Sequence, residues 1–116
     1  MGISVNIPSH PSNYVASNLK KKIKTVTMDI KNLSSLKKTV KRFKPDFIFH
    51  LAAQSLVSVS YQKPKETWET NLLGTLNVLE ILKNIKKKTV AIIITSDKAY
   101  KNVEKKEGYK ESDILA

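Results

Sequence analysis

The chain has 116 residues, 41% of them hydrophobic and 27% charged, which indicates one small globular domain and excludes a disordered or fibrous protein. It has no cysteine, no secretory signal and no apolar stretch that could cross a bilayer, so we expect a soluble, cytoplasmic protein without disulfides or thiolate metal sites. The formal net charge is +11, but Arg42 is the one arginine and aromatic residues do not alternate with the lysines, so a solvated surface is favoured over a nucleic-acid interface. A basic interaction or nucleic-acid-binding module is the alternative from another class.

The N-terminal part of the chain, through about residue 18, is rich in Ser, Asn and Pro. Pro8 and Pro11 exclude a regular helix there. Residues 23–30 alternate apolar and polar side chains and include β-branched residues, which predicts a short strand.

A helix is predicted next, with Asn32 or Ser34 as its cap and Pro45 at its end. Its apolar residues form a stripe at helical spacing, and lysines cover the other face. The stripe consists of Leu33, Leu36, Val40 and Phe43. Residues 46–53 are nearly all apolar, which is typical of a strand buried on both faces of a parallel sheet.

A long helix is predicted to begin at Pro64, because proline is favoured in the first helical turn. One side of this helix carries Trp68, Leu72, Leu76, Leu79 and Leu82 at helical spacing. Gly74 lowers the helix propensity, so we expect it to mark close packing against the sheet. Residues 89–95 are predicted to form the next buried strand, and residues 100–116 are polar with no evident partner in the chain.

The predicted order of strand, helix, strand, helix and strand gives two right-handed crossover units of an α/β fold. We expect a partial, Rossmann-like doubly wound parallel sheet of about three strands and two main helices. Such a sheet has two open edges, and two helices do not easily cover both of its faces. The architecture therefore predicts that further polypeptide belongs to it.

Several residues near the strand ends have both a ligand-binding and a structural interpretation. Asp29 can accept a hydrogen bond from a ligand or cap the following helix, and capping is favoured. His50 lies in an apolar strand, where a structural, hydrogen-bonded histidine is favoured over a catalytic one. Ala52 and Ala53 allow a ligand close to the backbone, although small residues at a strand end also simply pack. Asn71 lies within a helix and needs a water or a backbone contact near the site.

Ser96, Asp97 and Lys98 place a hydroxyl, a carboxyl and an amine on consecutive residues just after a predicted strand. This set can orient a substrate, donate a proton and accept one. The structural alternative is an exposed Asp-Lys turn. The two histidines, His10 and His50, are far apart in the sequence without ligand spacing around them, so we expect no metal site.

A series of short motifs covers nearly the whole chain. They are Met28-Asp29-Ile30-Lys31, Pro45-Asp46-Phe47-Ile48-Phe49-His50-Leu51-Ala52-Ala53-Gln54, Tyr61-x-x-Pro64, Thr70-Asn71-Leu72-Leu73-Gly74-Thr75, Thr95-Ser96-Asp97-Lys98-Ala99-Tyr100-Lys101-Asn102 and Gly108-Tyr109-Lys110-Glu111-Ser112-Asp113. Through these motifs the chain resembles the extended short-chain dehydrogenase/reductase (NAD-dependent epimerase/dehydratase) family, and within it the CDP-glucose 4,6-dehydratases. The HLAA and TNxxGT elements mark the superfamily, whereas Ser-Asp-Lys points to the CDP-glucose group.

The resemblance implies an NAD-dependent enzyme that removes water from a nucleotide sugar, CDP-glucose, and that forms a homodimer in its full-length form. NAD would accept a hydride from C4 of the sugar and return it to C6, while water leaves across C5 and C6. The implied cofactor-binding residues are Asp29 and Ile30 beside the adenine, Leu51, Ala52 and Ala53 along the dinucleotide, and also Asn71 and Thr95.

The resemblance also implies the catalytic roles. Ser96 would bond the sugar near O4, Asp97 would protonate the departing C6 hydroxyl, and Lys98 would remove the C5 proton. The similar dTDP-glucose dehydratases have threonine and glutamate at the positions of Ser96 and Lys98, so CDP-glucose is the favoured substrate. The alternative is another dehydratase or an epimerase of dTDP-, UDP- or GDP-sugars.

By the same resemblance, residues 1–116 correspond to the central part of an NAD-binding Rossmann domain. The family's glycine-rich unit would precede Met1, and its Tyr-x-x-x-Lys pair and sugar-binding part would follow Ala116. We therefore expect the chain alone neither to bind NAD tightly nor to turn over a sugar.

Overall fold

The structure, a computed structural model, describes residues 1–7 and 9–116, with the side chain of Asp97 outside the described part. The strands are β1 (Gly2–Ser4), β2 (Thr25–Thr27), β3 (Phe47–His50) and β4 (Val90–Ile93). The helices are α1 (Asn13–Ala16), α2 (Leu19–Lys22), α3 (Leu33–Phe43), α4 (Val57–Gln62), α5 (Pro64–Trp68) and α6 (Gly74–Lys83). A π-helical turn, η1 (Glu69–Leu73), joins α5 to α6, and a 3-10 turn, η2 (Asp97–Ala99), follows β4.

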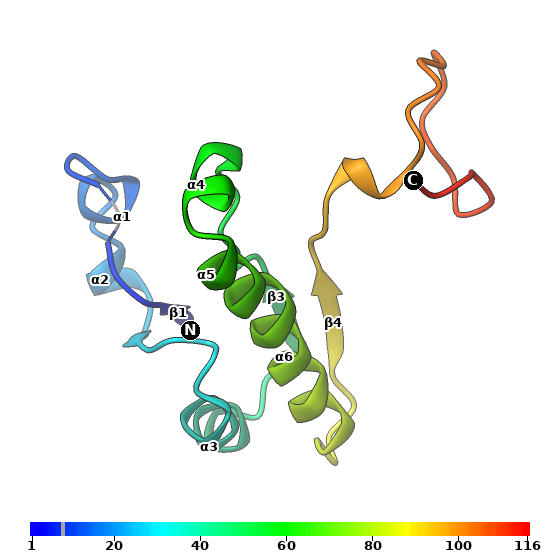
Figure 1. The fold of residues 1–116 in the computed structure, drawn as a ribbon. Coiled ribbons are helices and arrows are strands. Elements are labelled where there is room, and N and C mark those ends of the chain that lie inside the picture. The colour runs from blue at the N-terminus through cyan, green and yellow to red at the C-terminus, as the bar shows by residue number, and fades with distance from the viewer. Residues whose placement is uncertain (8) are drawn as a thin grey trace.

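The α/β fold class is confirmed, but the strands of the described residues form two sheets rather than one (Figure 1). β1 pairs in parallel with β2, with Ile3 opposite Val26. β3 pairs in parallel with β4, with His50 opposite Ile93. The prediction that three strands form one sheet is therefore wrong, because β2 pairs with the unpredicted strand β1 and neither strand pairs with β3.

The N-terminal part contains more regular structure than its composition indicates. The prediction that no regular helix occurs before about residue 18 is wrong after Pro11, because Ser12 caps α1 with its Oγ, which accepts the Val15 N–H at 3.3 Å. Asn18 then takes a left-handed conformation, with φ of 51°, between α1 and α2. The predicted strand 23–30 is shorter in the structure, where β2 covers Thr25–Thr27, and Pro8 lies outside the described residues.

The helix after β2 is confirmed, with Asn32 as its N-cap. The Oδ1 atom of Asn32 accepts the Ser35 N–H at 3.0 Å. Half of the predicted apolar stripe is buried, since Leu36 and Val40 are 4% and 8% exposed. Leu33 and Phe43, the outer two members, are exposed.

The long helix from Pro64 is confirmed as the continuous run of α5, η1 and α6, but most of the apolar side that the helical spacing defines is exposed. The buried side of α6 is Gly74, Val78 and Ile81. The exposed side chains are those of Trp68, Leu72, Leu76 and Leu79. The π turn accounts for part of this difference, because its i→i+5 bonding rotates the faces that follow it.

The predicted close packing at Gly74 is confirmed, but the contact is with the loop after β2 and not with a strand of the sheet. A Cβ atom built on Gly74 would lie 2.8 Å from Cγ1 of Ile30 and would overlap its Cδ1. Ile30 belongs to the core, so the absence of a side chain at Gly74 lets α6 approach the loop after β2.

The core lies between the sheets and one layer of helices. Its buried apolar side chains in the described residues are Ile30, Leu36, Val40, Val78 and Ile81. The opposite face of β3 and β4 is bare: Phe47 is 63% exposed and Phe49 61%. The prediction that these strands are buried on both faces is thus wrong within the described residues, since α3 and α6 cover one face.

The accessible surface is large for the mass of the chain. It measures 9683 Å², whereas a compact monomer of 13.1 kDa has about 6,400 Å². The radius of gyration is 16.5 Å, against roughly 13 Å for a compact domain of this length. Much of the excess lies on the bare sheet face and on the segment after η2, which projects away from the sheets (Figure 1, orange to red).

The segment 100–116 pairs with itself, which the sequence did not indicate. Tyr100 bridges to Leu115, and its ring stacks on that of Tyr109 at 5.2 Å between centroids. Lys105 lies over the Tyr109 ring and forms an ion pair with Asp113. Among the described residues, no helix has both the length and the apolar character needed to cross a membrane.

Candidate functional site

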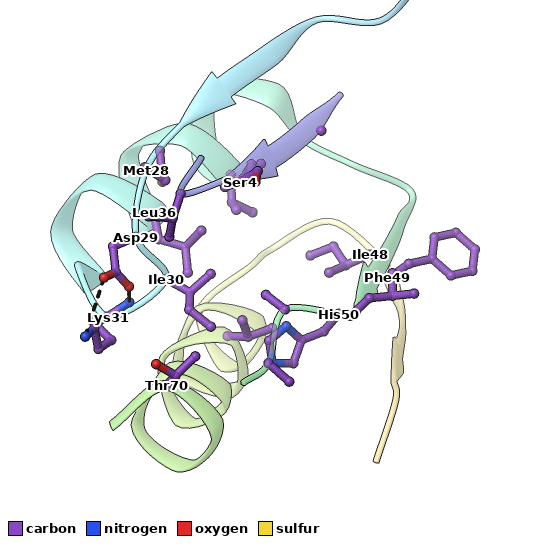
Figure 2. Close-up of a pocket in the computed structure, with 18 of the residues that line it drawn as sticks. Ser4, Met28, Asp29, Ile30, Lys31, Leu36, Ile48, Phe49, His50 and Thr70 are labelled. Carbon is purple, nitrogen blue, oxygen red and sulfur yellow. Dashed lines mark hydrogen bonds and ion pairs between the residues drawn. The ribbon is translucent and has the colours of Figure 1, made fainter. Parts of the chain in front are cut away.

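A cavity of about 900 Å³ lies between β1 and β3 (Figure 2). Both strands line it along their whole length, and α3 and α6 form its floor. Leu36, Val40, Val78 and Ile81 make that floor apolar. Polar groups enter at one end, where the loops after β2 and β3 meet it.

Five of the predicted cofactor-binding residues lie at this cavity. They are Asp29, Ile30, Leu51, Ala52 and Ala53. Two others, Asn71 and Thr95, do not line it in the part of the chain that the structure describes. The cavity thus combines a carboxylate, an apolar wall and two small residues in one place.

Asp29 does not cap α3, and the favoured interpretation of this residue is wrong. Its Oδ1 atom accepts the Lys31 N–H at 2.8 Å, and its Oδ2 atom lies 3.6 Å from Lys31 Nζ. Asn32 caps the helix in its place. The Asp29 carboxylate is therefore held at the mouth of the cavity, where Figure 2 shows it beside Lys31.

His50 has the structural role that the sequence favoured. It is 6% exposed, and its Nε2 atom lies 2.9 Å from Oγ1 of Thr75. The Thr75 hydroxyl donates to the carbonyl of Asn71 at 2.6 Å, so it accepts from His50 and the proton is assigned to Nε2. Burial lowers the pKa of His50 below its ordinary value, which favours this neutral form.

Asn71 makes the backbone contact that its position in a helix required. The N–H of Gln54 donates to Asn71 Oδ1 at 2.7 Å, and Asn71 Nδ2 donates to the Gln54 carbonyl at 2.9 Å. The Gln54 side chain in turn accepts the Leu56 N–H at 2.7 Å and donates to Oγ1 of Thr67 at 3.2 Å. The loop after β3 is thus fastened to the π turn.

Two positioning residues were missed by the sequence analysis. Gln54 organises the loop as just described, and Asn77 donates from Nδ2 to the carbonyls of Ile30 and Lys31 at 2.9 and 3.0 Å. Asn77 had a usable signal, because an asparagine within a helix needs a partner as Asn71 does. Gln54 had no such signal, since Thr67 and Asn71, which hold it to the helical run, are distant in sequence.

Ser96, Asp97 and Lys98 lie at the turn after β4. The Lys98 N–H donates to Ser96 Oγ at 3.2 Å, and the Lys98 side chain is exposed. The side chain of Asp97 lies outside the described residues. Neither Thr95 nor Ser96 nor Lys98 lines the described cavity.

This turn and the Leu51–Ala53 loop leave their sheet at the same edge. The Ile94 N–H donates to the carbonyl of His50 at 3.1 Å, so β3 and β4 end side by side. In open α/β sheets, ligands bind beyond this carboxyl edge. The arrangement can therefore present a cofactor along one loop to a substrate beside the other.

No group of three His, Asp or Glu side chains that could hold a metal occurs among the described residues. The residues at the cavity do fit part of a dinucleotide. Asp29 offers a hydrogen-bond acceptor, Ile30 offers an apolar surface, and Ala52 and Ala53 leave the backbone accessible.

Residues 5–116 match the family model described as GDP-mannose 4,6 dehydratase. The chain belongs to this family. It is 37% identical to the CDP-glucose 4,6-dehydratase of Salmonella typhimurium over 114 residues. The aligned region covers 98% of this chain and 32% of the Salmonella protein. The chain thus spans about a third of the length of this curated relative. Family membership places the described α/β structure among the Rossmann-like folds of extended short-chain dehydrogenases/reductases.

Two solved structures share this fold. The UDP-Glc/GlcNAc 4-epimerase of Campylobacter jejuni superimposes with a TM-score of 0.77 at 22% identity, over 99% of the chain and 35% of the epimerase. The UDP-glucose 4-epimerase of Bifidobacterium longum, solved with NAD+ and UDP, has a TM-score of 0.72 at 22% identity, over 98% of the chain and 35% of the epimerase. NAD is thus a cofactor bound by proteins of this fold.

Proposed function

We propose that residues 1–116 form the central part of an NAD-dependent 4,6-dehydratase that acts on CDP-glucose. The observation that carries the proposal is the shared carboxyl edge of β3 and β4, from which both the Ala52-Ala53 loop and the Ser96-Asp97-Lys98 turn emerge. The similarity to the Salmonella CDP-glucose 4,6-dehydratase supports the choice of reaction and of nucleotide sugar.

In this proposal the cavity residues hold the adenosine side of NAD. Asp29 and Ile30 lie against the adenine, and Ala52 and Ala53 leave room for the dinucleotide to pass close to the backbone. Asn71 acts indirectly, because it fixes the position of Gln54 at the end of that loop. When bound, NAD supplies a hydride acceptor at C4 of the sugar and a hydride donor at C6.

The turn after β4 acts on the sugar. Ser96 hydrogen-bonds near O4, Lys98 removes the proton from C5, and Asp97 gives a proton to the hydroxyl that leaves C6 as water. A proton is thus taken by a base and another is supplied by an acid on adjacent residues, which is the division of labour that an elimination needs. Exposure of Lys98 in this chain leaves its amine accessible to a sugar.

A chimera tests the proposal. Residues 1–116 replace the matching third of the Salmonella CDP-glucose 4,6-dehydratase, and turnover is measured with CDP-, dTDP-, UDP- and GDP-linked sugars. We expect the chimera to dehydrate CDP-glucose, and Asp97→Asn and Lys98→Met each to lower kcat about a hundredfold or more. Lys101→Met is the control, since it removes a nearby lysine outside the proposed set.

Unchanged kcat in both Asp97→Asn and Lys98→Met would contradict the proposed catalytic roles. Turnover of a UDP-sugar to its C4 epimer, with CDP-glucose untouched, would favour the epimerase alternative instead. The 116-residue chain alone is expected to show neither tight NAD binding nor turnover.

A further inference from the structure

The segment after η2 forms a loop that closes on itself. Tyr100 and Leu115 form an antiparallel bridge, and the Lys101 N–H donates to the carbonyl of Ile114 at 2.9 Å. A surface segment of this length with its ends held together is typical of an Ω-loop, which is packed by its own side chains. In Figure 1 the end of the chain returns beside the start of this segment, close to η2. Residues 100–115 are called the closed loop below.

The side chain of Tyr109 connects the two halves of the closed loop. Its ring stacks on that of Tyr100 at 5.2 Å between centroids, and Lys105 Nζ lies 4.7 Å from the centroid of the Tyr109 ring. Its hydroxyl accepts the Val103 N–H at 3.1 Å and donates to Asn102 Oδ1 at 3.2 Å. Aromatic stacking and a cation over a ring are both favourable. Tyr109 therefore holds the second half of the loop against the first.

The closed loop is held by its own polar contacts and not by the sheets. Lys105 forms an ion pair with Asp113, whose Oδ2 atom also accepts the Lys110 N–H at 2.6 Å. Within the described part of the chain, the hydrogen bonds and ion pairs of residues 100–116 all have their partners at residues 99–116. A substitution in the closed loop should therefore leave the core of the molecule intact.

The base of the closed loop is bonded to the turn that follows β4. The Ala116 N–H donates to the carbonyl of Ala99 at 3.1 Å, and the Ala99 N–H donates to the carbonyl of Ser96 at 3.2 Å. Ala99, the last residue of η2, is thus bonded on one side to the turn and on the other to the returning chain. Lys98 lies directly before Ala99, so a shift of the loop base moves the backbone that carries the Lys98 amine.

From these contacts we propose that Tyr109 is a positioning residue for the Ser96-Asp97-Lys98 turn. By closing the loop, Tyr109 fixes the backbone at Ala99 and thereby the direction of the Lys98 side chain. The effect on catalysis rests on the proposed function, in which Lys98 removes the C5 proton. The effect on the turn stands on the loop contacts alone. If the closed loop stabilised only itself, loss of the Tyr109 side chain would change nothing at Ala99.

Two variants of the 116-residue chain separate these alternatives. Tyr109→Leu removes the ring and the hydroxyl, whereas Tyr109→Phe keeps the ring and removes both hydroxyl hydrogen bonds. Lys106→Ala is the control, since this exposed side chain of the same loop has no hydrogen bond or ion pair among the described residues. Amide hydrogen exchange is followed by NMR, and urea denaturation reports the stability of the core.

We expect exchange at Ala99 and Lys101 to quicken about fivefold or more in Tyr109→Leu and to change less in Tyr109→Phe. The urea midpoint should be the same in all variants. Faster exchange at Lys101 with unchanged exchange at Ala99 would overturn the proposal, because the loop would then open without moving the turn. Equal quickening in Lys106→Ala, or a lower urea midpoint with equal quickening in α6, would overturn it as well.

The chimera with the Salmonella CDP-glucose 4,6-dehydratase tests the consequence for catalysis. Tyr109→Leu should lower kcat about tenfold and leave the KM for NAD within about twofold, because the cavity residues are untouched. Tyr109→Phe should recover most of the lost kcat. An unchanged kcat in Tyr109→Leu would overturn the effect on catalysis. A parent chimera that fails to dehydrate CDP-glucose would instead contradict the proposed function, and exchange at Ala99 would still decide whether Tyr109 positions the turn.

Discussion

The two faces of β3 have opposite environments although they belong to the same four residues. Ile48 packs against the core and His50 is buried. Phe47, before Ile48, and Phe49, between Ile48 and His50, are both more than half exposed. In Figure 2 the Phe49 ring points away from the other labelled side chains. Apolar character in this strand therefore does not report burial. Both faces of β3 are apolar enough to be packed against another element, but among the described residues α3 and α6 pack on only one of them.

The largest predicted change in the free energy of unfolding distinguishes a residue on the covered side from one on the bare face of β3. Ile81→Ala removes a side chain that is 4% exposed in α6, and we expect it to lower the free energy of unfolding by about 2–5 kcal/mol. Phe49→Ala removes a larger side chain from the bare face and should change it by about 0.5 kcal/mol or less. Urea denaturation of both variants checks the comparison. Comparable losses would mean that the bare face is covered in solution.

A smaller effect is expected at the closest contact on the covered side. Gly74→Ala places a methyl group against Ile30 and should cost about 1–3 kcal/mol by overpacking, less the gain of roughly 1 kcal/mol in helix propensity. The matched control is Gly108→Ala, where a Cβ atom would meet nothing within 4 Å. Thermal unfolding of the two variants should show a lower Tm for Gly74→Ala alone. Equal Tm values would show that Ile30 yields without cost.

A local effect is expected at the polar end of the cavity. Asn71→Ala removes both hydrogen bonds to Gln54 and should cost about 1 kcal/mol overall, because each exposed bond contributes modestly. Amide exchange at Gln54 should quicken far more than exchange in α3. Asn84→Ala, which removes a bond to Glu80 at the end of α6, serves as the control. Slow exchange at Gln54 in the Asn71 variant would show that the two hydrogen bonds from Asn71 do not hold the loop after β3 in place.

The smallest effect concerns pH. Burial lowers the pKa of His50 below 6.5, so the unfolded chain binds this proton more tightly than the folded chain. Stability should therefore be full above about pH 6.5 and should fall as the pH drops through the lower folded value, by at most about 1.4 kcal/mol per pH unit.

Urea titrations between pH 4.5 and 7.5 measure this slope, and His50→Gln should flatten it while His10→Gln does not. Asp113 contributes to the pH dependence of stability in a more acidic range than His50 does. Its hydrogen bond from Lys105 lowers its pKa below 3.8, so its contribution is kept above that pH and lost in stronger acid. A slope that survives His50→Gln would assign the titration to another group.

Sequence reasoning succeeded where a residue's own chemistry demanded a partner. A histidine in an apolar strand, an asparagine in a helix and a glycine in a helix each predicted a contact, and His50, Asn71 and Gly74 have those contacts. Asn32 was one of three candidate caps of α3, with Asp29 and Ser34, and it is the residue that caps the helix.

The failures share a different cause. The exposed stripe of α6 could not be told from its buried side, because Leu76 and Val78 are both apolar and only the tertiary partner decides between them. The split of the sheet depends on which strands meet, and a three-residue strand such as β1 carries too little pattern to be seen. The catalytic assignments at Ser96, Asp97 and Lys98 stay predictions.

The high lysine content has a consequence for the behaviour of the chain in solution. With a bare apolar sheet face and open strand edges, an uncharged chain of this shape would be prone to self-association. The net charge of +11 provides long-range repulsion between molecules, which salt weakens as the Debye length falls from about 10 Å at 0.1 M to 3 Å at 1 M. The chain should therefore stay dispersed at low ionic strength and associate at high ionic strength, so light scattering should rise steeply as salt is added.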